Sequence, residues 1–234
     1  MISIFKKEFK NYFRTPIGFV FLAPFIFLAS MQFIAILVNT NQANVNYILT
    51  YVNLLCLFIV PILTMQLLSE ERNKKTDQLL LTVPVSVWDI VLGKFCAAFS
   101  VFLIGCGITL IYPVIFSVIG SPIISEIIGQ YIGFVFIWGT FIAVGLFISS
   151  CTESQVISAI LTFVVLFFLY SVDSWTSTIG NETVRNIVSW FSVMNRYADF
   201  QVGLINIPNV VYYVSFIFVF LFLTHRNIEK RRYS

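Results

Sequence analysis

Long apolar runs without charge constrain this chain more than any other feature. Residues 15–69, 95–125, 127–152 and 200–225 contain no Asp, Glu, Lys or Arg. A soluble domain carries about 25% charged residues, whereas this chain carries 11%. Apolar stretches of about 20 residues match the hydrocarbon core of a bilayer when they are helical, and a helix satisfies its own backbone hydrogen bonds, which lipid cannot do. The sequence therefore predicts an all-α membrane protein.

Six of the apolar runs are long enough to cross a membrane. They are expected at about 17–38, 47–68, 92–118, 129–150, 155–174 and 208–225. We interpret the whole chain, residues 1–234, as a single transmembrane domain, with a loop at 69–91 and a larger segment at 175–207 on the opposite side. The 175–207 segment is rich in Trp, Tyr and periodic apolar residues, which favours short helices that dip into the membrane interface.

The basic residues predict the orientation of the spans. Lys and Arg collect in the cytoplasmic loops of membrane proteins. With six spans, twelve of the 14 basic residues fall on one side, before the first span, between the second and third, and after the sixth. Only Arg185 and Arg196 fall on the other side. We therefore expect both termini to lie in the cytoplasm.

Residues 1–15 form a separate element ahead of the first span. Their apolar residues recur at helical spacing, and most of their basic residues take the opposite face. This pattern predicts a helix that lies in the cytoplasmic interface, with its aromatic rings at the acyl boundary and its cations near the headgroups. A simple positively charged anchor is the alternative. The residues assigned to the interfacial helix are Phe5, Lys6, Phe9, Lys10 and Phe13.

A dense run of charge follows the second span. Six of the eight residues from Glu70 to Asp77 are charged, and the leucine-rich stretch after them is too short to cross a membrane. Pro84 then interrupts the chain, and Ser86 to Asp89 has the pattern of a helix N-cap. Leucines in a short cytoplasmic element need cover from the bilayer or from another protein. The loop is therefore either a solvated turn that sets the topology or a docking element for a partner.

Catalytic and nucleotide-binding motifs are missing from the sequence. It has no GxxxxGK[ST] phosphate loop, no HExxH and no GxSxG. Charged residues inside spans mark many proton- and ion-coupled carriers, but here Asp173 is the one acidic candidate. The four cysteines lack CxxC spacing and are interpreted as small apolar fillers. We expect no enzyme activity, bound cofactor or metal on this chain, so a partner would supply the energy for any transport.

Three stretches of the sequence resemble the permeases of ABC-2-type transporters. EERNKKTDQLLLTVPVSVWDIVLGK (70–94) is similar to the loop between their second and third spans, with an acidic-Arg pair, a Thr, a Leu-rich run, a Pro-hydrophobic-Ser turn and a Gly-Lys pair. GLFISSCTESQVISAI (145–160) resembles the junction of their fourth and fifth spans, and 192–232 resembles their external segment, sixth span and basic tail. Lys75 departs from the pattern, since the family often has Gly there. Within the family, the chain most resembles permeases of the gliding-motility-associated Gld transporters.

This resemblance implies a six-span ABC-2 transmembrane domain of the type V exporter kind in a bacterial cytoplasmic membrane. Such permeases work as homodimers or heterodimers. Each rests on a separate ABC ATPase subunit, which would bind the ATP and Mg²⁺ that this chain does not. Membrane lipid and an accessory membrane or external subunit are further expected partners, and nucleic acid is not. The alternatives left open are a passive channel, a secondary carrier, and a membrane scaffold that recruits an ATPase without transport.

The resemblance also assigns site residues. The ATPase-docking residues are Glu70, Glu71, Arg72, Lys74, Lys75, Thr76, Asp77, Leu79, Leu80 and Leu81. A second, smaller cytoplasmic contact is expected at Thr152 and Glu153. Apart from the resemblance, the charged residues Arg185, Arg196 and Asp199 on the predicted external side are either contacts for an anionic substrate or headgroup, or interfacial anchors.

Overall fold

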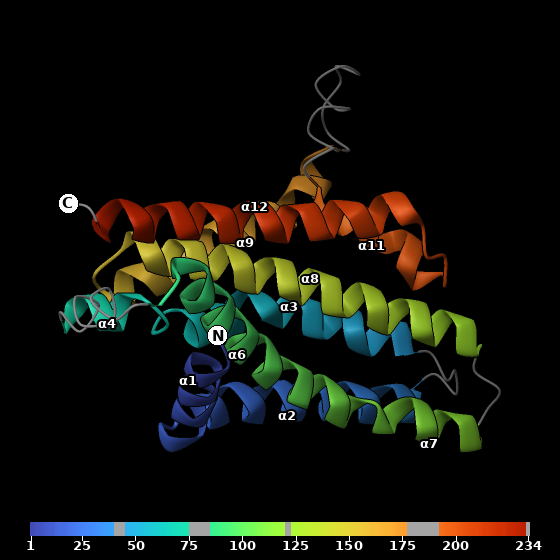
Figure 1. Cartoon of the computed structure of the whole chain (residues 1–234). Coiled ribbons are helices and arrows are strands. Elements are labelled where there is room, and N and C mark those ends of the chain that lie inside the picture. The colour runs from blue at the N-terminus through green and yellow to red at the C-terminus, as the bar shows by residue number, and fades with distance from the viewer. Residues whose placement is uncertain (40–44, 75–84, 120–122, 177–191, 233–234) are drawn as a thin grey trace.

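The computed structural model describes residues 1–39, 45–74, 85–119, 123–176 and 192–232. All the regular elements in these ranges are helices (Figure 1). They are α1 (Ile2–Arg14), α2 (Ile17–Asn39), α3 (Val45–Thr64), α4 (Ser69–Asn73), α6 (Val87–Thr109), α7 (Ile111–Ile119), α8 (Ile124–Cys151), α9 (Gln155–Thr176), α11 (Val193–Gln201) and α12 (Ile207–Arg232).

Six helical stretches in the described part of the chain are long and apolar enough to cross a membrane, which confirms the predicted all-α, six-span fold. They cover 17–38, 45–73, 87–118, 124–151, 155–174 and 207–231. The third starts at Val87 rather than at 92, and the fourth starts at Ile124 rather than at 129. The difference arises because hydropathy marks the apolar part of a helix, whereas its polar first turns lie beyond that part.

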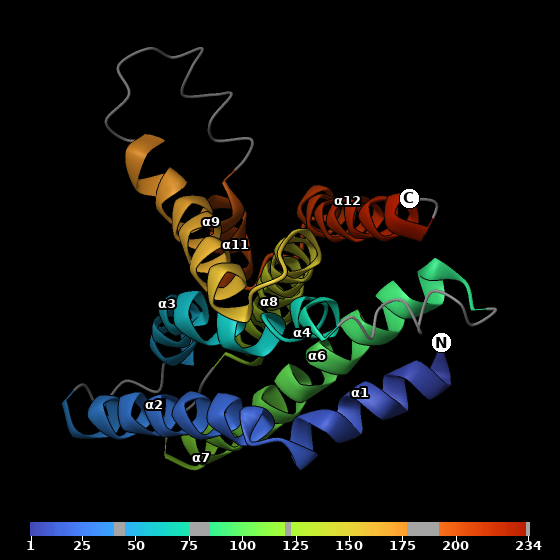
Figure 2. The ribbon, with the colours of Figure 1, turned by 90° about the vertical axis from the view of Figure 1, so that its left-hand side faces the viewer.

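Helix α8 is the central helix of the bundle. Figure 2 shows it surrounded by α3, α6, α9, α11 and α12. In the most apolar stretch of α8, 78% of the residues are buried, against 22% in α9 and in α12. The two peripheral helices expose large apolar side chains such as Val164 and Phe218, as expected of surfaces that face lipid.

An aromatic cluster from α2, α6 and α8 forms the core. The fully buried ring of Trp138 lies 4.7 Å from that of Phe102 and 5.3 Å from that of Phe25. Such pairs contribute about 0.5–1.5 kcal/mol each beyond the area that they bury. Trp138 Nε1 also donates to Asn53 Oδ1 of α3 at 3.2 Å. Because lipid supplies no hydrophobic drive between helices, this packing and hydrogen bonding must hold them together.

The third span is broken at Leu110, between α6 and α7. Pro113 has no N–H, so the carbonyl of Thr109 lacks a helical partner. The hydroxyl of Tyr131 on α8 donates to that carbonyl at 2.8 Å. A neighbouring helix must supply such a donor because the bilayer core contains no water. The contact also fixes α8 against the joint.

Two helices at opposite ends of the bundle are packed without crossing it. α1 lies across the end where both termini are found (Figure 1), with the rings of Phe5, Phe9 and Phe13 in one row along it. α11 packs on α8 at the other end. A Cβ on Gly133 would come within 2.7 Å of Phe200 Cβ, so glycine allows this close approach.

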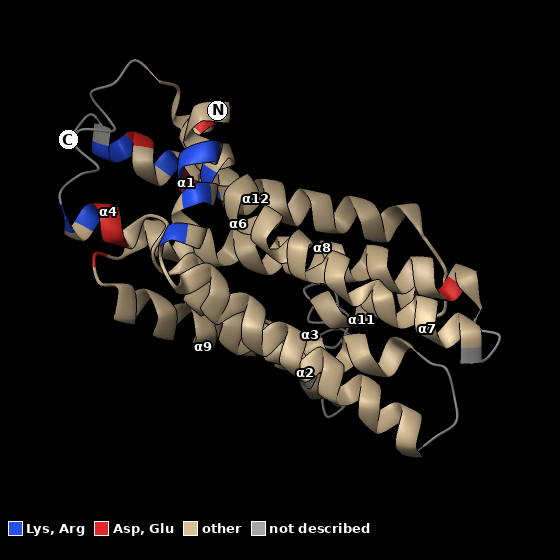
Figure 3. Ribbon diagram, turned by 90° about the horizontal axis from the view of Figure 1, so that it is seen from below, with Lys and Arg blue, Asp and Glu red and all other residues tan. Residues whose placement is uncertain are grey.

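Lys and Arg gather at the end that carries the termini, on α1, α4 and the last turns of α12 (Figure 3). We call this the basic end of the bundle. The even number of spanning helices places all three basic segments together, in agreement with the distribution predicted from the sequence.

Candidate functional site

Helix α4 carries the start of the charged run beyond the apolar part of the second span. The chain turns between α3 and α4, and Ser149 of α8 holds this turn. Its hydroxyl accepts the backbone N–H groups of Leu68 at 3.1 Å and Ser69 at 3.2 Å, and it donates to the Met65 carbonyl at 3.2 Å. The first N–H groups of a helix need such acceptors. The central helix therefore determines the direction in which α4 leaves the bundle.

Arg72 joins α4 to the turn between α8 and α9. Its Nη2 lies 2.6 Å from Glu153 Oε1, and its Nη1 donates to the Cys151 carbonyl at 3.1 Å. Asn73 Nδ2 donates to the Glu153 carbonyl at 3.3 Å. The Glu153 side chain is 67% exposed, so the ion pair adds only about 0.2–1 kcal/mol to stability. Its importance is geometric, because it unites two segments from distant parts of the sequence into one surface.

The same turn is held on its other side by α12. Asn227 Nδ2 donates to the Ser150 carbonyl at 3.0 Å and to the Ser150 hydroxyl at 2.9 Å. Arg231 also donates to the Ser150 carbonyl. We refer to Glu70, Arg72, Asn73, Lys74 and Glu153 as the α4 surface. The part of it that contains Glu153 is held in place by the ends of α8 and α12.

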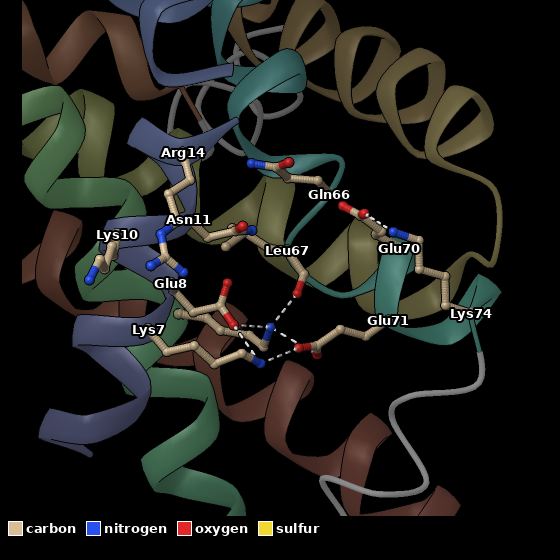
Figure 4. Close-up of a pocket in the computed structure, with 11 residues that line it drawn as sticks. Lys7, Glu8, Lys10, Asn11, Arg14, Gln66, Leu67, Glu70, Glu71 and Lys74 are labelled. Carbon is tan, nitrogen blue, oxygen red and sulfur yellow. Dashed lines mark hydrogen bonds and ion pairs between the residues drawn. The ribbon is translucent and has the colours of Figure 1, made fainter. Parts of the chain in front are cut away.

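Glu71 lies on the inner side of α4 and belongs to a buried charge cluster (Figure 4). Lys94 Nζ of α6, whose side chain is 1% exposed, lies 2.8 Å from Glu71 Oε2 and 3.1 Å from Glu8 Oε1 of α1. It also donates to the Leu67 carbonyl at 2.6 Å. These three acceptors match the three N–H donors of an ammonium group. Lys7 Nζ lies 3.5 Å from Glu71 and 3.6 Å from Glu8, so two cations balance two carboxylates.

This cluster ties three helices together at the basic end. A buried charge is very costly unless it is paired and hydrogen-bonded, so Glu71, Lys94 and Glu8 must stay in contact. Glu71 belongs to α4, Lys94 to α6 and Glu8 to α1. A displacement of α4 therefore either moves α1 and α6 with it or separates buried charges.

The sequence-predicted docking residues fall into three groups. Glu70, Arg72 and Lys74 lie on the α4 surface, where Lys74 Nζ is 2.6 Å from Glu70 Oε1. Glu71 has the internal partners just described, so its docking role stays a prediction. The others lie outside the residues that the structure describes: Lys75, Thr76, Asp77, Leu79, Leu80 and Leu81. Of the second predicted contact, Glu153 reaches Arg72, whereas the Thr152 hydroxyl donates to the Ile148 carbonyl of its own helix end at 3.3 Å.

The external candidates Arg196 and Asp199 connect α11 to α12. The Arg196 guanidinium lies 4.2 Å above the Tyr212 ring and donates to Asn209 Oδ1 at 3.4 Å. Asp199 Oδ2 accepts from Asn206 Nδ2 at 2.9 Å and from Asn209 Nδ2 at 2.7 Å. These contacts favour the interpretation as anchors. Arg185 lies outside the described residues.

Sequence reasoning missed Glu8 and gave Lys94 no partner. A signal was present, because Glu8 is the one acidic residue in the otherwise basic helix α1. Nothing in the sequence indicated that its partner would be Lys94, far along the chain. Ser149 was likewise inside a stretch that resembles the family, but its capping role depends on the fold.

No group of three or more His, Cys, Asp or Glu residues that could hold a metal ion is found in the described ranges. The geometry of the basic end instead suits contact with another protein or with lipid headgroups. Its chemistry is that of ion pairs and hydrogen-bond donors, supplied by side chains on helix ends.

Comparison with known proteins gives a family. No curated protein matches the chain. The model of the ABC-2 family transporter proteins matches residues 2–198. The match extends from α1 into α11, so it includes α4, the buried charge cluster and five of the six spanning helices. The chain therefore belongs to the ABC-2 family of transporter membrane proteins.

Proposed function

We propose that this chain is the permease subunit of an ABC-2 exporter and that a separate ABC ATPase subunit docks on its α4 surface. The observation that carries the docking proposal is the Arg72–Glu153 pair. It makes a single exposed surface from the two segments that resemble the ATPase contacts of the family. Residues 1–234 contain no phosphate loop, so in this proposal a partner supplies the ATPase activity.

The location of the α4 surface supports the proposal. It lies at the basic end, and the positive-inside rule puts that end in the cytoplasm, where ATP is available. The surface is polar and projects beyond the apolar part of the second span. Exposed charges at the rim of an interface act mainly on association rate and specificity, which suits a contact that must form with one particular ATPase.

The contacts behind the surface suggest how movement of the ATPase would reach the spans. A push on α4 acts through Glu71 on Lys94 and Glu8, and thus on α6 and α1. It acts through Ser149 on α8. ATP binding can shift the permease between two states only if the ATPase contacts them with different free energies. In this proposal, the α4 surface is where that difference arises.

Charge reversal at the pair tests the proposal. Arg72→Glu and Glu153→Arg each replace the ion pair with like charges, which repel each other and separate the two segments of the α4 surface. We expect each variant to recover less ATPase subunit in a pull-down from native membranes, and the double variant Arg72→Glu/Glu153→Arg to restore recovery. Arg226→Glu, at the basic end but outside the α4 surface, is the matched control. The proposal is wrong if no ATPase is recovered with the unmodified chain, or if both single variants recover it normally.

Transport itself needs a second experiment, because a scaffold would also bind an ATPase. The complex, reconstituted in vesicles, is expected to move a lipid or hydrophobic solute outward only when ATP is hydrolysed. An ATPase that binds and turns over without any movement of such a solute would favour the scaffold. The more specific resemblance to the Gld permeases stays a prediction. The identity of the genes that neighbour the gene for this chain would test it.

We also propose that two permeases pair through α2 and α9, as the family resemblance implies for the first and fifth spans. These two helices lie on either side of α3 (Figure 2). Both helices are largely exposed in the single chain. A cysteine at Val164 of α9 is expected to cross-link to a second permease chain in native membranes, and one at Val219 of α12 is not. Cross-linking at Val219 alone would place the dimer contact on the opposite face.

A further inference from the structure

A cavity of about 400 Å³ opens beside the buried charge cluster, between α1, the end of α3 and α4 (Figure 4). Its volume falls at the lower end of the range of small-ligand pockets, which is about 300–1,000 Å³. Five of its lining residues are basic and three are acidic. The cavity therefore carries a net positive charge.

The acidic residues of the cavity are already neutralised. Glu8 and Glu71 are paired with Lys94 and Lys7, and Glu70 is paired with Lys74. This pairing leaves no acidic partner in the cavity for its other two cations, Lys10 and Arg14.

Lys10 and Arg14 have no ion-pair partner within the described part of the chain. Both are exposed and line the cavity. They are separated by four residues, so they lie one turn apart on the same face of α1. Two unpaired cations at this spacing form a binding site for an anion, and an Arg guanidinium matches the geometry of a phosphate oxygen pair.

Neutral polar groups complete the site. Asn11, between the two cations, presents an amide to the cavity. Gln66, in the turn between α3 and α4, also lines it and is only 6% exposed. The Gln66 Oε1 atom is buried and has no hydrogen-bond partner in the described structure. A buried acceptor without a donor is costly, so a ligand with a hydroxyl or an amine would satisfy it.

The position of Arg14 in the chain indicates the level of the cavity relative to the membrane. Arg14 ends α1, and the first spanning helix starts at Ile17, three residues later. The row of Phe5, Phe9 and Phe13 on α1 has the character of a helix that rests in the membrane interface. From these two observations we infer that Arg14 lies near the headgroup region of the bilayer, where lipid phosphates are found.

We propose that this cavity binds the phosphate of an anionic lipid headgroup, with Lys10 and Arg14 as its cations and Gln66 as the acceptor for a headgroup hydroxyl. Basic pockets beside spanning helices on the cytoplasmic side are known to suit anionic headgroups. Lys10, Arg14 and Gln66 lie outside the α4 surface, although Glu70 and Lys74 of that surface also line the cavity. The inference does not depend on the docking of an ATPase. A bound lipid would bridge α1 and the end of α3 next to the charge cluster.

The test measures lipid binding to the purified full-length chain by native mass spectrometry. Phosphatidylglycerol, which has both an anionic phosphate and hydroxyls, is compared with zwitterionic phosphatidylcholine. The test variant is Lys10→Gln/Arg14→Gln, which removes the two unpaired cations. The matched control is Arg226→Gln/Lys230→Gln, which removes two exposed cations of α12 at the basic end that do not line the cavity.

We expect phosphatidylglycerol to bind the unmodified chain and the control with the same affinity, within twofold. We expect at least a tenfold loss in the test variant. Glycerol 3-phosphate distinguishes a soluble phosphate from a lipid phosphate. If it binds as tightly as phosphatidylglycerol, with the same dependence on Lys10 and Arg14, the phosphate site is supported and its ligand is soluble. If it binds more weakly than phosphatidylglycerol, the ligand is the lipid.

Two results would overturn the inference. One is equal binding of phosphatidylglycerol to the test variant and to the control; if ATPase recovery falls in the test variant at the same time, these cations belong to the contact with the protein partner. The other is equal binding of phosphatidylcholine and phosphatidylglycerol to the unmodified chain. Gln66→Leu gives an independent reading, because it removes the unpaired acceptor without altering charge and is expected to weaken phosphatidylglycerol binding.

Discussion

Replacement of Lys94 by Met tests whether the buried charge cluster holds the basic end together. Met retains most of the volume of the side chain but removes the ammonium group. The substitution leaves the carboxylates of Glu8 and Glu71 without their closest cation, and it leaves the Leu67 carbonyl without its donor. We expect Lys94→Met to lower the stability of the chain strongly.

The magnitude follows from the geometry. Removal of one partner from a buried ion pair costs about 3–5 kcal/mol, because the other charge is left uncompensated. Lys7 Nζ stays 3.6 Å from Glu8 and 3.5 Å from Glu71, so we expect the lower end of this range. For a chain of this length, 1 kcal/mol shifts Tm by about 2–4 °C, which gives a decrease of about 6–12 °C.

Thermal unfolding of the purified chain in detergent, followed by fluorescence, measures this decrease. Lys74→Met is the matched control, since its pair with Glu70 is exposed and such helical pairs contribute only about 0.3–0.5 kcal/mol. If the cost comes from uncompensated charge, then Glu8→Gln with Glu71→Gln in the Lys94→Met chain should recover much of the lost Tm. A Tm for Lys94→Met within 1–2 °C of the control, or a triple variant no more stable than Lys94→Met, would refute the reasoning.

Three further predictions concern other contacts. Burial raises the pKa of the Tyr12 phenol well above its ordinary value, with a further increase from Glu8 and a decrease from a Gln66 hydrogen bond. The fold therefore favours the neutral phenol, and this contribution is present below about pH 10 and lost as the pH rises further. Tyr12→Phe should reduce the loss of stability above pH 10, measured as the difference from wild type, while it costs about 1–3 kcal/mol at pH 7 because the Leu63 carbonyl loses its donor. Gly145→Ala should destabilise by about 1–3 kcal/mol in thermal unfolding, because its Cβ would collide with the Thr64 hydroxyl oxygen; an unchanged Tm would contradict the close approach of α3 and α8. Asp199→Ala removes the acceptor that two Asn amides share and should expose the start of α12 to proteolysis, whereas substrate transport lost without any change in proteolysis would favour a substrate contact.

The spans could be predicted from the sequence because lipid imposes a simple rule. Every apolar run must be helical and about as long as the bilayer is thick, so composition alone located all six. The distribution of Lys and Arg then grouped the three basic segments at one end. Ser86 was correctly identified as the N-cap of α6, although its side chain makes no capping hydrogen bond.

The interior of the basic end could not be predicted in the same way. The charged run and the predicted topology are equally consistent with exposed and with buried positions for Glu71 and Lys94. The positive-inside rule does not distinguish a solvated lysine from a buried one. The contact between them depends on where α1 crosses the end of the bundle, which is a property of tertiary packing. Likewise, the pairing of Arg72 with Glu153 required two helix ends, 81 positions apart in the sequence, to be placed side by side.

The joint at Leu110 divides the third span into two rods. A continuous helix transmits rotation from one end to the other, but a joint secured by one side-chain hydrogen bond from Tyr131 absorbs part of it. α8, by contrast, is unbroken from Ile124 to Cys151 and caps α4 through Ser149. We therefore expect a rotation applied at the basic end to be transmitted to the far end of the bundle more completely by α8 than by α6. In this view α8 is the rigid element of the molecule, and α7 can move relative to α6.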